Sequence, residues 1–207
     1  MTTHNAAFET SEYDHRIAKT RAAMSAAGMD AIFVTDPSNQ AWLTGYDGWS
    51  FYVHQGVILT MEGEPIWWGR YMDMMGGRRT CWMQHENIIG YGDHYVQSTE
   101  IHPMQDLAAH LKARGLAQAR IGVEMENYYY SAKAHAVLVE ELPAANLIDV
   151  TALVNWQRLI KSDAEICFIR KAARITEKVI HTAIERAAPV YARMILLQIL
   201  YMQVLPV

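Results

Sequence analysis

Over residues 1–157, short apolar runs alternate with segments of helical periodicity, and this alternation restricts the fold more than any other feature. Runs rich in Ile, Val and aromatic residues predict strands at 30–35, 56–61, 65–69, 86–92, 120–125 and 146–150. Helices are predicted at 11–27, 103–114 and 131–141, with a short one after Asp36 and Pro37. Because Glu-Gly-Glu between the second and third runs predicts a hairpin, we expect an α/β domain over residues 1–157, with a mixed β-sheet flanked by helices.

Beyond residue 158 the pattern changes to one long helical segment, residues 162–188. Ser162 and Glu165 have the spacing of a capping box, which predicts the start of the helix. Its apolar residues fall near one face: Ile166, Ile169, Ala173, Ile180 and Ile184. We expect residues 158–188 to be a linker and the first helix of a second, truncated domain. The Ile face should pack outside residues 1–157, in a dimer or larger homo-oligomer.

The composition argues against several classes of protein. The net charge is −4 and there is no basic run, so nucleic acid is not an expected partner. The two cysteines, Cys81 and Cys167, are far apart, which favours reduced thiols and a cytoplasmic location over a disulfide framework. The chain start lacks a signal-peptide pattern, so no secretion is expected. The longest apolar tract, 194–207, is shorter than the roughly 18 residues of a membrane span, so no membrane partner is expected.

Catalytic and metal-binding patterns are incomplete in the sequence. Among nine histidines, the metal-site candidates His85, His94 and His102 do not match the spacing His-Glu-x-x-His, so we favour surface or loop histidines. The segment MMGGRRT lacks the Gly-Lys-Ser/Thr ending of a phosphate-binding loop. There is no Gly-x-Ser-x-Gly nucleophile elbow. We therefore predict no catalytic residue, no metal ligand and no cofactor in this chain.

The densest group of unusual residues is the segment LTGYDGWSFYVHQGV, residues 43–57, which combines glycines, aromatic rings, an Asp and a His. A second segment, EPIWWGRYMD at 64–73, adds two tryptophans and an arginine. Aromatic faces with a few polar groups suit a small, partly charged organic ligand. Trp and Tyr are also common in interfaces, so packing alone is an alternative that the residues leave open.

The order of the elements, together with LTGYDGWSFYVHQGVILTMEGEPIWWGR and RLIKSDAEICFIRKAARI, resembles the creatinase/prolidase/aminopeptidase P family. The resemblance covers residues 10–188 and implies an N-terminal α/β domain followed by a catalytic domain of the pita-bread fold. Within this family, GYDGWSFYVHQG, EPIWWGRYMD and GYGDHYVQSTEIHPMQDLA are most similar to the ectoine hydrolases, which open the cyclic amidine of ectoine. The implied activity is hydrolysis of a C–N bond.

In this family the N-terminal domain of one subunit covers the active site of its neighbour. The resemblance therefore implies a homodimer in which residues 46–54 help to close the partner's pocket. Trp49 and Tyr52 would pack on the substrate ring, because ectoine carries a delocalised cation. His54 and Arg70 would meet the substrate carboxylate. The candidate pocket residues are Tyr46, Asp47, Trp49, Tyr52, His54, Trp68 and Arg70.

The resemblance places the catalytic groups beyond residue 207. Metal-dependent members take carboxylate and His ligands from the pita-bread domain, and the creatinase branch, which uses no metal, has its catalytic His there too. We expect this chain to bind a small-molecule substrate only together with that domain, and to be inactive alone. A divalent metal would belong to the full-length parent protein.

Residues 189–207, PVYARMILLQILYMQVLPV, carry one charge and are apolar on every side, although a surface helix needs a polar face. The same bases can be translated in the neighbouring reading frame. A codon that starts at the G of the Met194 codon ATG must then be GAT, for Asp, and one that starts at the G of the Met202 codon must be GCA, for Ala. One restored G after Pro189 permits the amphipathic string PGVRANDIVADIVYAGIA. We expect a frameshifted or non-native tail, and the alternative is a genuine oligomerisation helix.

Three functions stay open from the sequence. The first is the N-terminal domain of an enzyme like ectoine hydrolase, with a dimerising and pocket-covering role. The second is a creatinase-like or Xaa-Pro dipeptidase-like member of the same family. The third is a non-enzymatic module that assembles or binds a ligand.

Overall fold

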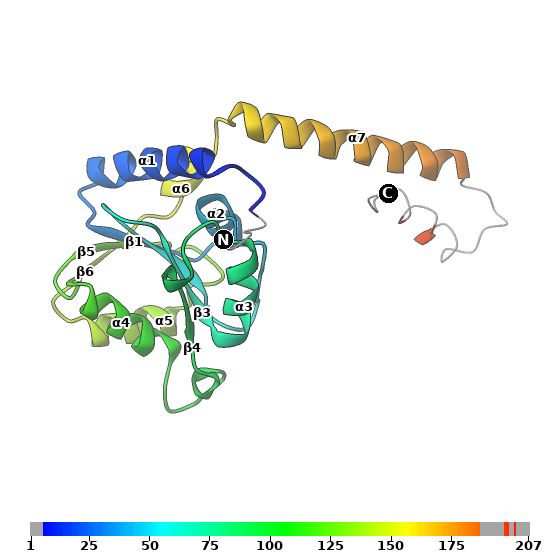
Figure 1. Cartoon of the computed structure of the whole chain (residues 1–207). Helices are drawn as coiled ribbons and strands as arrows, with labels where there is room; N and C mark the ends of the chain where they lie inside the picture. The colour runs from blue at the N-terminus through cyan, green and yellow to red at the C-terminus, as the bar shows by residue number, and fades with distance from the viewer. Residues whose placement is uncertain (1–5, 187–196, 199–200, 202–207) are drawn as a thin grey trace. The chain divides into compact units, whose positions relative to one another are not determined.

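The computed structural model describes residues 6–186, 197–198 and 201. The chain forms two compact units, Met1–Leu159 and Ile160–Val207 (Figure 1). The first unit is an α/β domain whose six strands form one sheet in the order β4-β3-β2-β1-β5-β6. The strands are β1 (Ala31–Val34), β2 (Gly56–Thr60), β3 (Ile66–Arg70), β4 (Ile88–Tyr91), β5 (Arg120–Val123) and β6 (Asn146–Asp149).

The sheet is mixed, as predicted. The β2–β3 hairpin is antiparallel, and β2 also runs antiparallel to β1. The pairs β1–β5, β3–β4 and β5–β6 are parallel. The carboxyl ends of β1 and β5 therefore meet at the same edge of the sheet, where Phe33 is opposite Val123.

Helices cover both faces of this sheet (Figure 1). One face packs against α1 (Thr10–Ala26), α2 (Pro37–Thr44), α3 (Tyr71–Thr80) and α6 (Leu153–Gln157). The other face packs against α4 (Pro103–Ala113) and α5 (Ala132–Glu141). Two short 3₁₀ turns, η1 (His85–Asn87) and η2 (Asp93–Tyr95), precede and follow β4. The prediction of an α/β fold flanked by helices is confirmed.

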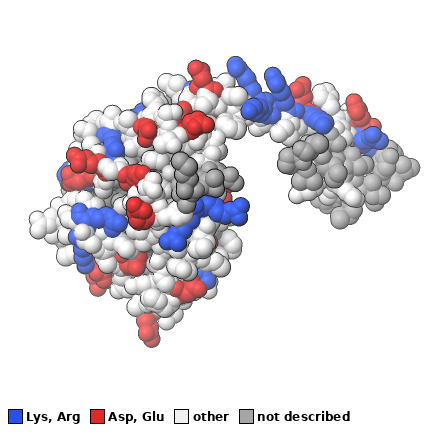
Figure 2. Space-filling model, viewed as in Figure 1, with Lys and Arg blue, Asp and Glu red and all other residues white. Residues whose placement is uncertain are grey.

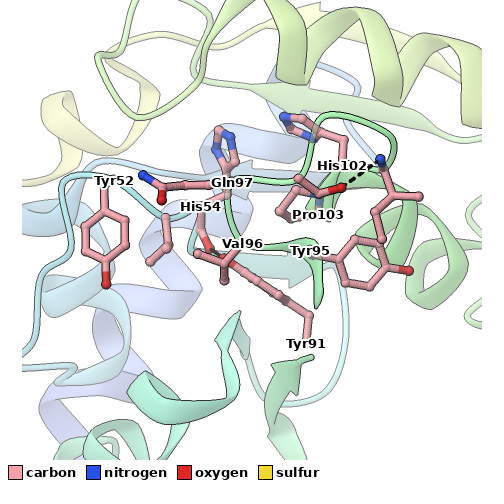
Figure 3. A pocket seen from close by; sticks show the side chains of 11 residues that line it. Tyr52, His54, Tyr91, Tyr95, Val96, Gln97, His102 and Pro103 are labelled. Atoms are coloured by element: carbon pink, nitrogen blue, oxygen red, sulfur yellow. Dashed lines mark hydrogen bonds between the residues drawn. The ribbon is translucent and has the colours of Figure 1, made fainter. Parts of the chain in front are cut away.

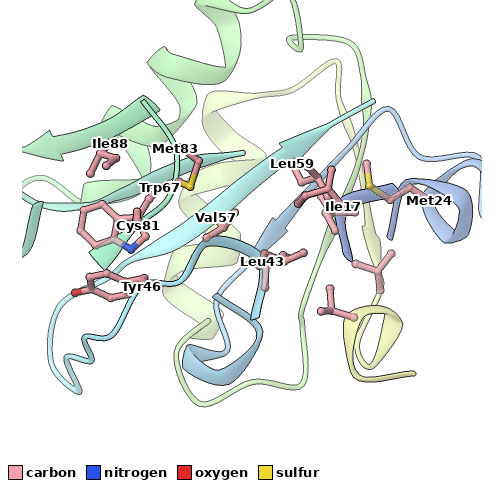
Figure 4. Packing of buried hydrophobic residues seen from close by; sticks show 14 of the residues in the cluster. Ile17, Met24, Leu43, Tyr46, Val57, Leu59, Trp67, Cys81, Met83 and Ile88 are labelled. Carbon is pink, nitrogen blue, oxygen red and sulfur yellow. The ribbon is translucent and has the colours of Figure 1, made fainter. Parts of the chain in front are cut away.

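Each face of the sheet has its own hydrophobic core. Trp67 contributes to the core on the α1–α3 side, together with Val57, Leu59 and Ile88 (Figure 4). Its neighbour Trp68 contributes to the opposite core, because successive side chains of a strand point to opposite faces. Both indoles are fully buried, so the pair WW marks a central strand covered on both sides.

Helix α3 was not predicted. Its sequence, YMDMMGGRRT, contains two adjacent glycines, which are poor helix formers. Tertiary packing outweighs this local preference, because Met74 and Gly77 are buried against the sheet. A Cβ at Gly77 would lie 3.1 Å from Cγ2 of Ile88, so the helix approaches the strand closely at this glycine.

The second unit contains α7 (Asp163–Arg186), which begins with the predicted capping box. The main-chain N–H of Ser162 donates to Oε2 of Glu165 (2.8 Å), and the N–H of Glu165 donates to Oγ of Ser162 (3.2 Å). Ile180 and Ile184 are exposed, and the packing of this face stays a prediction. The predicted origin of residues 189–207 concerns a segment that, apart from 197–198 and 201, lies outside the described residues.

The surface of the α/β unit mixes acidic and basic side chains. Figure 2 shows both signs interspersed over its visible face, consistent with the small net charge of −4. Within the described residues, no helix is both long and apolar enough to cross a membrane.

The close packing at Gly56 generates a prediction. A Cβ there would lie 2.4 Å from the Phe33 ring and 2.8 Å from the carbonyl oxygen of Val34, so Gly56→Ala should destabilise the domain by about 1–3 kcal/mol. Gly76 in α3 is the matched control, because a Cβ there meets nothing within 4 Å. Gly76→Ala should be neutral or stabilising by up to about 1 kcal/mol. Urea unfolding measures both, and equal losses in the two variants would contradict the packing described.

Candidate functional site

The aromatic loop, residues 46–55, connects α2 to β2 and contains most of the predicted site residues. Helix α2 begins as predicted, with the Asp36 carboxylate accepting from the N–H of Asn39 (3.0 Å). It ends at Gly45, whose left-handed conformation (φ 78°) favours glycine. A Cβ at Gly45 would also lie 2.8 Å from the hydroxyl of Tyr13, so the chain turns into the loop at a tightly packed point.

Two of the predicted pocket residues are core residues. Tyr46 is buried against Trp67, with ring centroids 4.7 Å apart, and its hydroxyl donates to Oε1 of Gln55 (3.3 Å). Trp68 is fully buried, and its indole N–H donates to Oδ1 of Asp106 (2.7 Å). The prediction that Tyr46 and Trp68 face a substrate does not match the structure. Tyr46 instead packs the start of the loop against Trp67 of the sheet.

The exposed part of the loop is a row of three rings that we call the aromatic ridge: Trp49, Phe51 and Tyr52. Their side chains are 59%, 75% and 48% exposed, respectively. The rings touch in sequence, with centroids 6.0 Å apart for Trp49–Phe51 and 5.4 Å for Phe51–Tyr52. Phe51 was not among the predicted site residues. Asp47, which was, is exposed beside the ridge, and its main-chain N–H donates to Oγ1 of Thr80 (3.2 Å).

Arg70 is engaged within the domain. Its Nε and Nη2 donate to the two carboxylate oxygens of Asp93 (2.7 and 3.2 Å), and its Nη1 donates to the hydroxyl of Tyr52 (3.0 Å). The hydrogen bonds from Arg70 lower the pKa of Asp93. Because Asp93 occupies the two-pronged face of the guanidinium, a substrate carboxylate could reach that face only by displacing Asp93. In this structure Arg70 restrains one ring of the ridge, that of Tyr52, through this hydrogen bond.

His54 lines a small pocket beside the ridge (Figure 3). The pocket has a volume of about 140 Å³, close to that of a cavity that holds a benzene ring. The hydroxyl of Tyr91 donates to the main-chain oxygen of His54 (2.8 Å) and so fixes the loop at this point. The lining residues are Tyr52, Val53, His54, Tyr91, Tyr95, Val96, Gln97, Ser98, Ile101, His102 and Pro103.

The sequence did not indicate that His54 and His102 would meet in this pocket. Their ring centroids are 4.8 Å apart. Burial lowers the pKa of His54, opposed by a hydrogen bond to the main chain at Tyr129. Burial, with the nearby His54 and Lys133, lowers the pKa of His102 to about 4. His102 is therefore uncharged at neutral pH, and the lowered pKa of His54 favours the neutral form of its ring.

A buried carboxylate joins the segments that follow β1 and β5. Glu124 follows β5 directly and is almost inaccessible to solvent. Its Oε2 accepts from the main-chain N–H groups of Thr35 and Asp36 (both 2.7 Å), and its Oε1 accepts from Nδ2 of Asn39 (2.6 Å). Burial raises the pKa of Glu124, and these hydrogen bonds oppose the shift. An acidic residue directly after an apolar strand was the available sequence signal, and it was missed.

Metal-binding groups do not cluster in the part of the chain that the structure describes: no three His, Cys, Asp or Glu side chains are placed to hold an ion. Burial raises the pKa of the Cys81 thiol to about 12, which disfavours the nucleophilic thiolate. Among the described residues, these observations identify neither a metal site nor an activated thiol.

Comparison with known proteins agrees with this architecture. The model of the creatinase/prolidase N-terminal domain matches residues 16–160, which is most of the α/β unit. The chain belongs to this family. It is 53% identical to the ectoine hydrolase of Halomonas elongata over 169 residues, which are 81% of this chain and 42% of that protein. It is 40% identical to an uncharacterised hydrolase/peptidase, y4tM, of Sinorhizobium fredii, over 88% of this chain and 47% of that protein.

Solved structures of the family share the fold at low sequence identity. The Xaa-Pro dipeptidase of Bacillus anthracis superposes with a TM-score of 0.68 at 17% identity, over 92% of this chain and 48% of that one. The N-terminal domain of the peptidase PepQ from Mycobacterium tuberculosis superposes with a TM-score of 0.51 at 15% identity, over 70% of this chain and 98% of that one. The chain thus spans less than half the length of the curated relatives above.

The Glu124 network generates a prediction. In Glu124→Gln one carboxylate oxygen becomes an NH₂ group, which then faces either two main-chain N–H groups or the amide NH₂ of Asn39. Turning the Asn39 amide does not resolve the clash, because its Oδ1 accepts from Nη1 of Arg158 (2.6 Å). We expect a loss of about 1–3 kcal/mol in the free energy of unfolding. The exposed neighbour Glu126→Gln is the control, expected within about 0.5 kcal/mol of wild type; a similar value for Glu124→Gln would contradict this role.

The histidine pair predicts a pH dependence. The pKa of His102 is about 4 in the folded chain and about 6.5 in the unfolded chain. Between these two pH values the unfolded chain binds a proton at His102 and the folded chain does not, which favours unfolding. Stability from this difference is present above pH 6.5 and is lost as the pH falls towards 4. His102→Asn does not titrate and keeps an acceptor for the N–H of Met104, which His102 Nδ1 now caps at 3.2 Å.

The measurement is the urea midpoint at pH 7.5 and pH 5.0. The decrease in the urea midpoint from pH 7.5 to pH 5.0 should be smaller in His102→Asn than in wild type. Part of the decrease should remain, because the pKa of His54 is also lowered. His15→Asn, at an exposed position, should keep the wild-type fall. Identical pH profiles for wild type and His102→Asn would show that His102 is not responsible.

Proposed function

We propose that this chain is the N-terminal, pocket-covering half of a C–N bond hydrolase whose substrate is ectoine. The observation that carries the proposal is its 53% identity over 169 residues to the ectoine hydrolase of Halomonas elongata. The similarity to the creatinase of a Bacillus species is lower, 26% over 170 residues. The Xaa-Pro dipeptidases resemble the chain at 17–18% identity, which supports the shared fold and not their substrate.

The aromatic ridge is the surface suited to a substrate. The rings of Trp49 and Tyr52 are exposed and can pack on the delocalised cation of an amidine. A ridge supplies one wall, whereas a small-molecule site encloses most of its ligand. The second wall, the catalytic groups and any divalent metal belong to the other half of the enzyme. The isolated chain is inactive for this reason.

The proposed assembly is a homodimer in which the ridge of one subunit covers the catalytic half of its neighbour. In this arrangement Trp49 and Tyr52 contact the substrate ring, and His54 offers a neutral hydrogen bond. Asp47 lies at the edge of this surface. Exposed apolar area of this kind is a common mark of an interaction surface.

A chimeric enzyme tests the proposal. Residues 1–186 of this chain replace the matching N-terminal half of Halomonas elongata ectoine hydrolase. The chimera should form a dimer by light scattering and hydrolyse ectoine, but neither creatine nor an Xaa-Pro dipeptide. Trp49→Ala should lower kcat/KM by about tenfold or more, because a desolvated stacking contact is lost, and His54→Ala should lower it less.

The matched control is Tyr128→Ala, which removes a fully exposed aromatic ring that is not one of the three ridge rings. Its kcat/KM should stay within about twofold of the parent chimera. A folded, dimeric chimera that acts on creatine or dipeptides in preference to ectoine would reject the substrate. Equal activity of the parent and Trp49→Ala would reject the role of the ridge.

A further inference from the structure

Two predicted site residues of the aromatic loop contact the same residue outside it, Tyr129. The indole Nε1 of Trp49 donates to the Tyr129 hydroxyl at 2.6 Å. The two rings also meet edge to face, with centroids 6.4 Å apart and planes at 89°. The ring of His54 is hydrogen-bonded to the main chain at Tyr129. The side chain of Tyr129 thus holds Trp49, and its main chain holds His54.

Tyr129 itself lies in a well-fixed turn between β5 and α5. The side-chain Oδ1 of Asn127 accepts from the N–H of Tyr129 (2.9 Å), and its main-chain oxygen accepts from the N–H of Tyr130 (3.0 Å). Tyr130 is buried against Phe33, with ring centroids 6.5 Å apart. On the other side, the segment begins at the buried Glu124. Tyr129 is therefore connected to the core on both sides, whereas Trp49 is 59% exposed.

We propose that Tyr129 is a positioning residue that sets the orientation of the Trp49 indole. An exposed tryptophan without a partner can adopt several staggered rotamers. The hydrogen bond to Tyr129 selects one of them before a ligand arrives, which reduces the ordering cost of binding. The part of the inference that concerns substrate rests on the proposed function.

The sequence could not separate Tyr129 from its neighbours, because residues 128–130 are three consecutive tyrosines. The structure gives each a different environment. Tyr128 is 103% exposed, Tyr129 contacts Trp49, and Tyr130 is buried. Tyr128 is therefore a matched control at the adjacent position, with the same side chain and the same substitution.

The first experiment uses the chain itself and needs no activity. The six tryptophans give indole N–H resonances in a ¹⁵N spectrum, and Trp49→Phe identifies that of Trp49. Tyr129→Phe, which removes only the acceptor oxygen, should shift the Trp49 resonance and speed its exchange with water. Tyr128→Phe should leave it unchanged. A Trp49 resonance that stays in place in Tyr129→Phe overturns the proposal.

The second experiment measures kinetics in the chimeric ectoine hydrolase. Tyr129→Phe should raise KM about 3- to 10-fold, the range of one ordinary hydrogen bond, with kcat within about twofold. Tyr128→Phe should change neither constant. If Tyr129→Phe leaves KM unchanged while Trp49→Ala raises it, the positioning role is wrong. If Trp49→Ala also leaves KM unchanged while the resonance shifts in Tyr129→Phe, the tether stands and the proposed function of the ridge fails.

Discussion

The buried carboxylate of Glu124 is the interaction on which the arrangement of the site depends. It joins the carboxyl ends of the parallel strands β1 and β5 by accepting from Thr35, Asp36 and Asn39. Three N–H donors partly compensate for the loss of water around the charge and make the contact specific in direction. The turn that leads through α2 to the aromatic loop and the turn that carries Tyr129 both begin at this carboxylate.

Along the aromatic loop, the side chains change from buried to exposed within a few residues. Tyr46 is packed on Trp67 at the base of the loop, whereas Trp49 and Phe51 present most of their surface to solvent. The exposed rings are nevertheless restrained, Trp49 by the Tyr129 hydroxyl and Tyr52 by Arg70. A surface of this kind is ordered in advance of contact, which lowers the entropic cost of covering a ligand.

Periodicity predicted the strands, most of the helices and the cap at Asp36, because those features depend on neighbours in the sequence. Periodicity could not show which aromatic residues of the loop are buried, because an irregular segment has no repeating pattern. Nothing in the sequence therefore distinguishes the buried Tyr46 from the exposed Trp49. Periodicity also could not pair Arg70 with Asp93, or bring His54 beside His102, because these contacts join distant segments. Helix α3 was missed for the opposite reason: its local glycines oppose the packing that forms it.

The charge states of Arg70 and His54 decide how a substrate carboxylate could be recognised. Arg70 has its two-pronged face on Asp93, and the lowered pKa of His54 leaves that ring uncharged at neutral pH. An anionic group brought to the ridge would therefore find hydrogen-bond donors but no unpaired positive charge among these residues. Under the proposed function, these residues would contribute ring packing, and compensation of the carboxylate would fall to the other half of the enzyme. In such a division the ridge would recognise the delocalised cation of the ligand, and its carboxylate would be paired elsewhere.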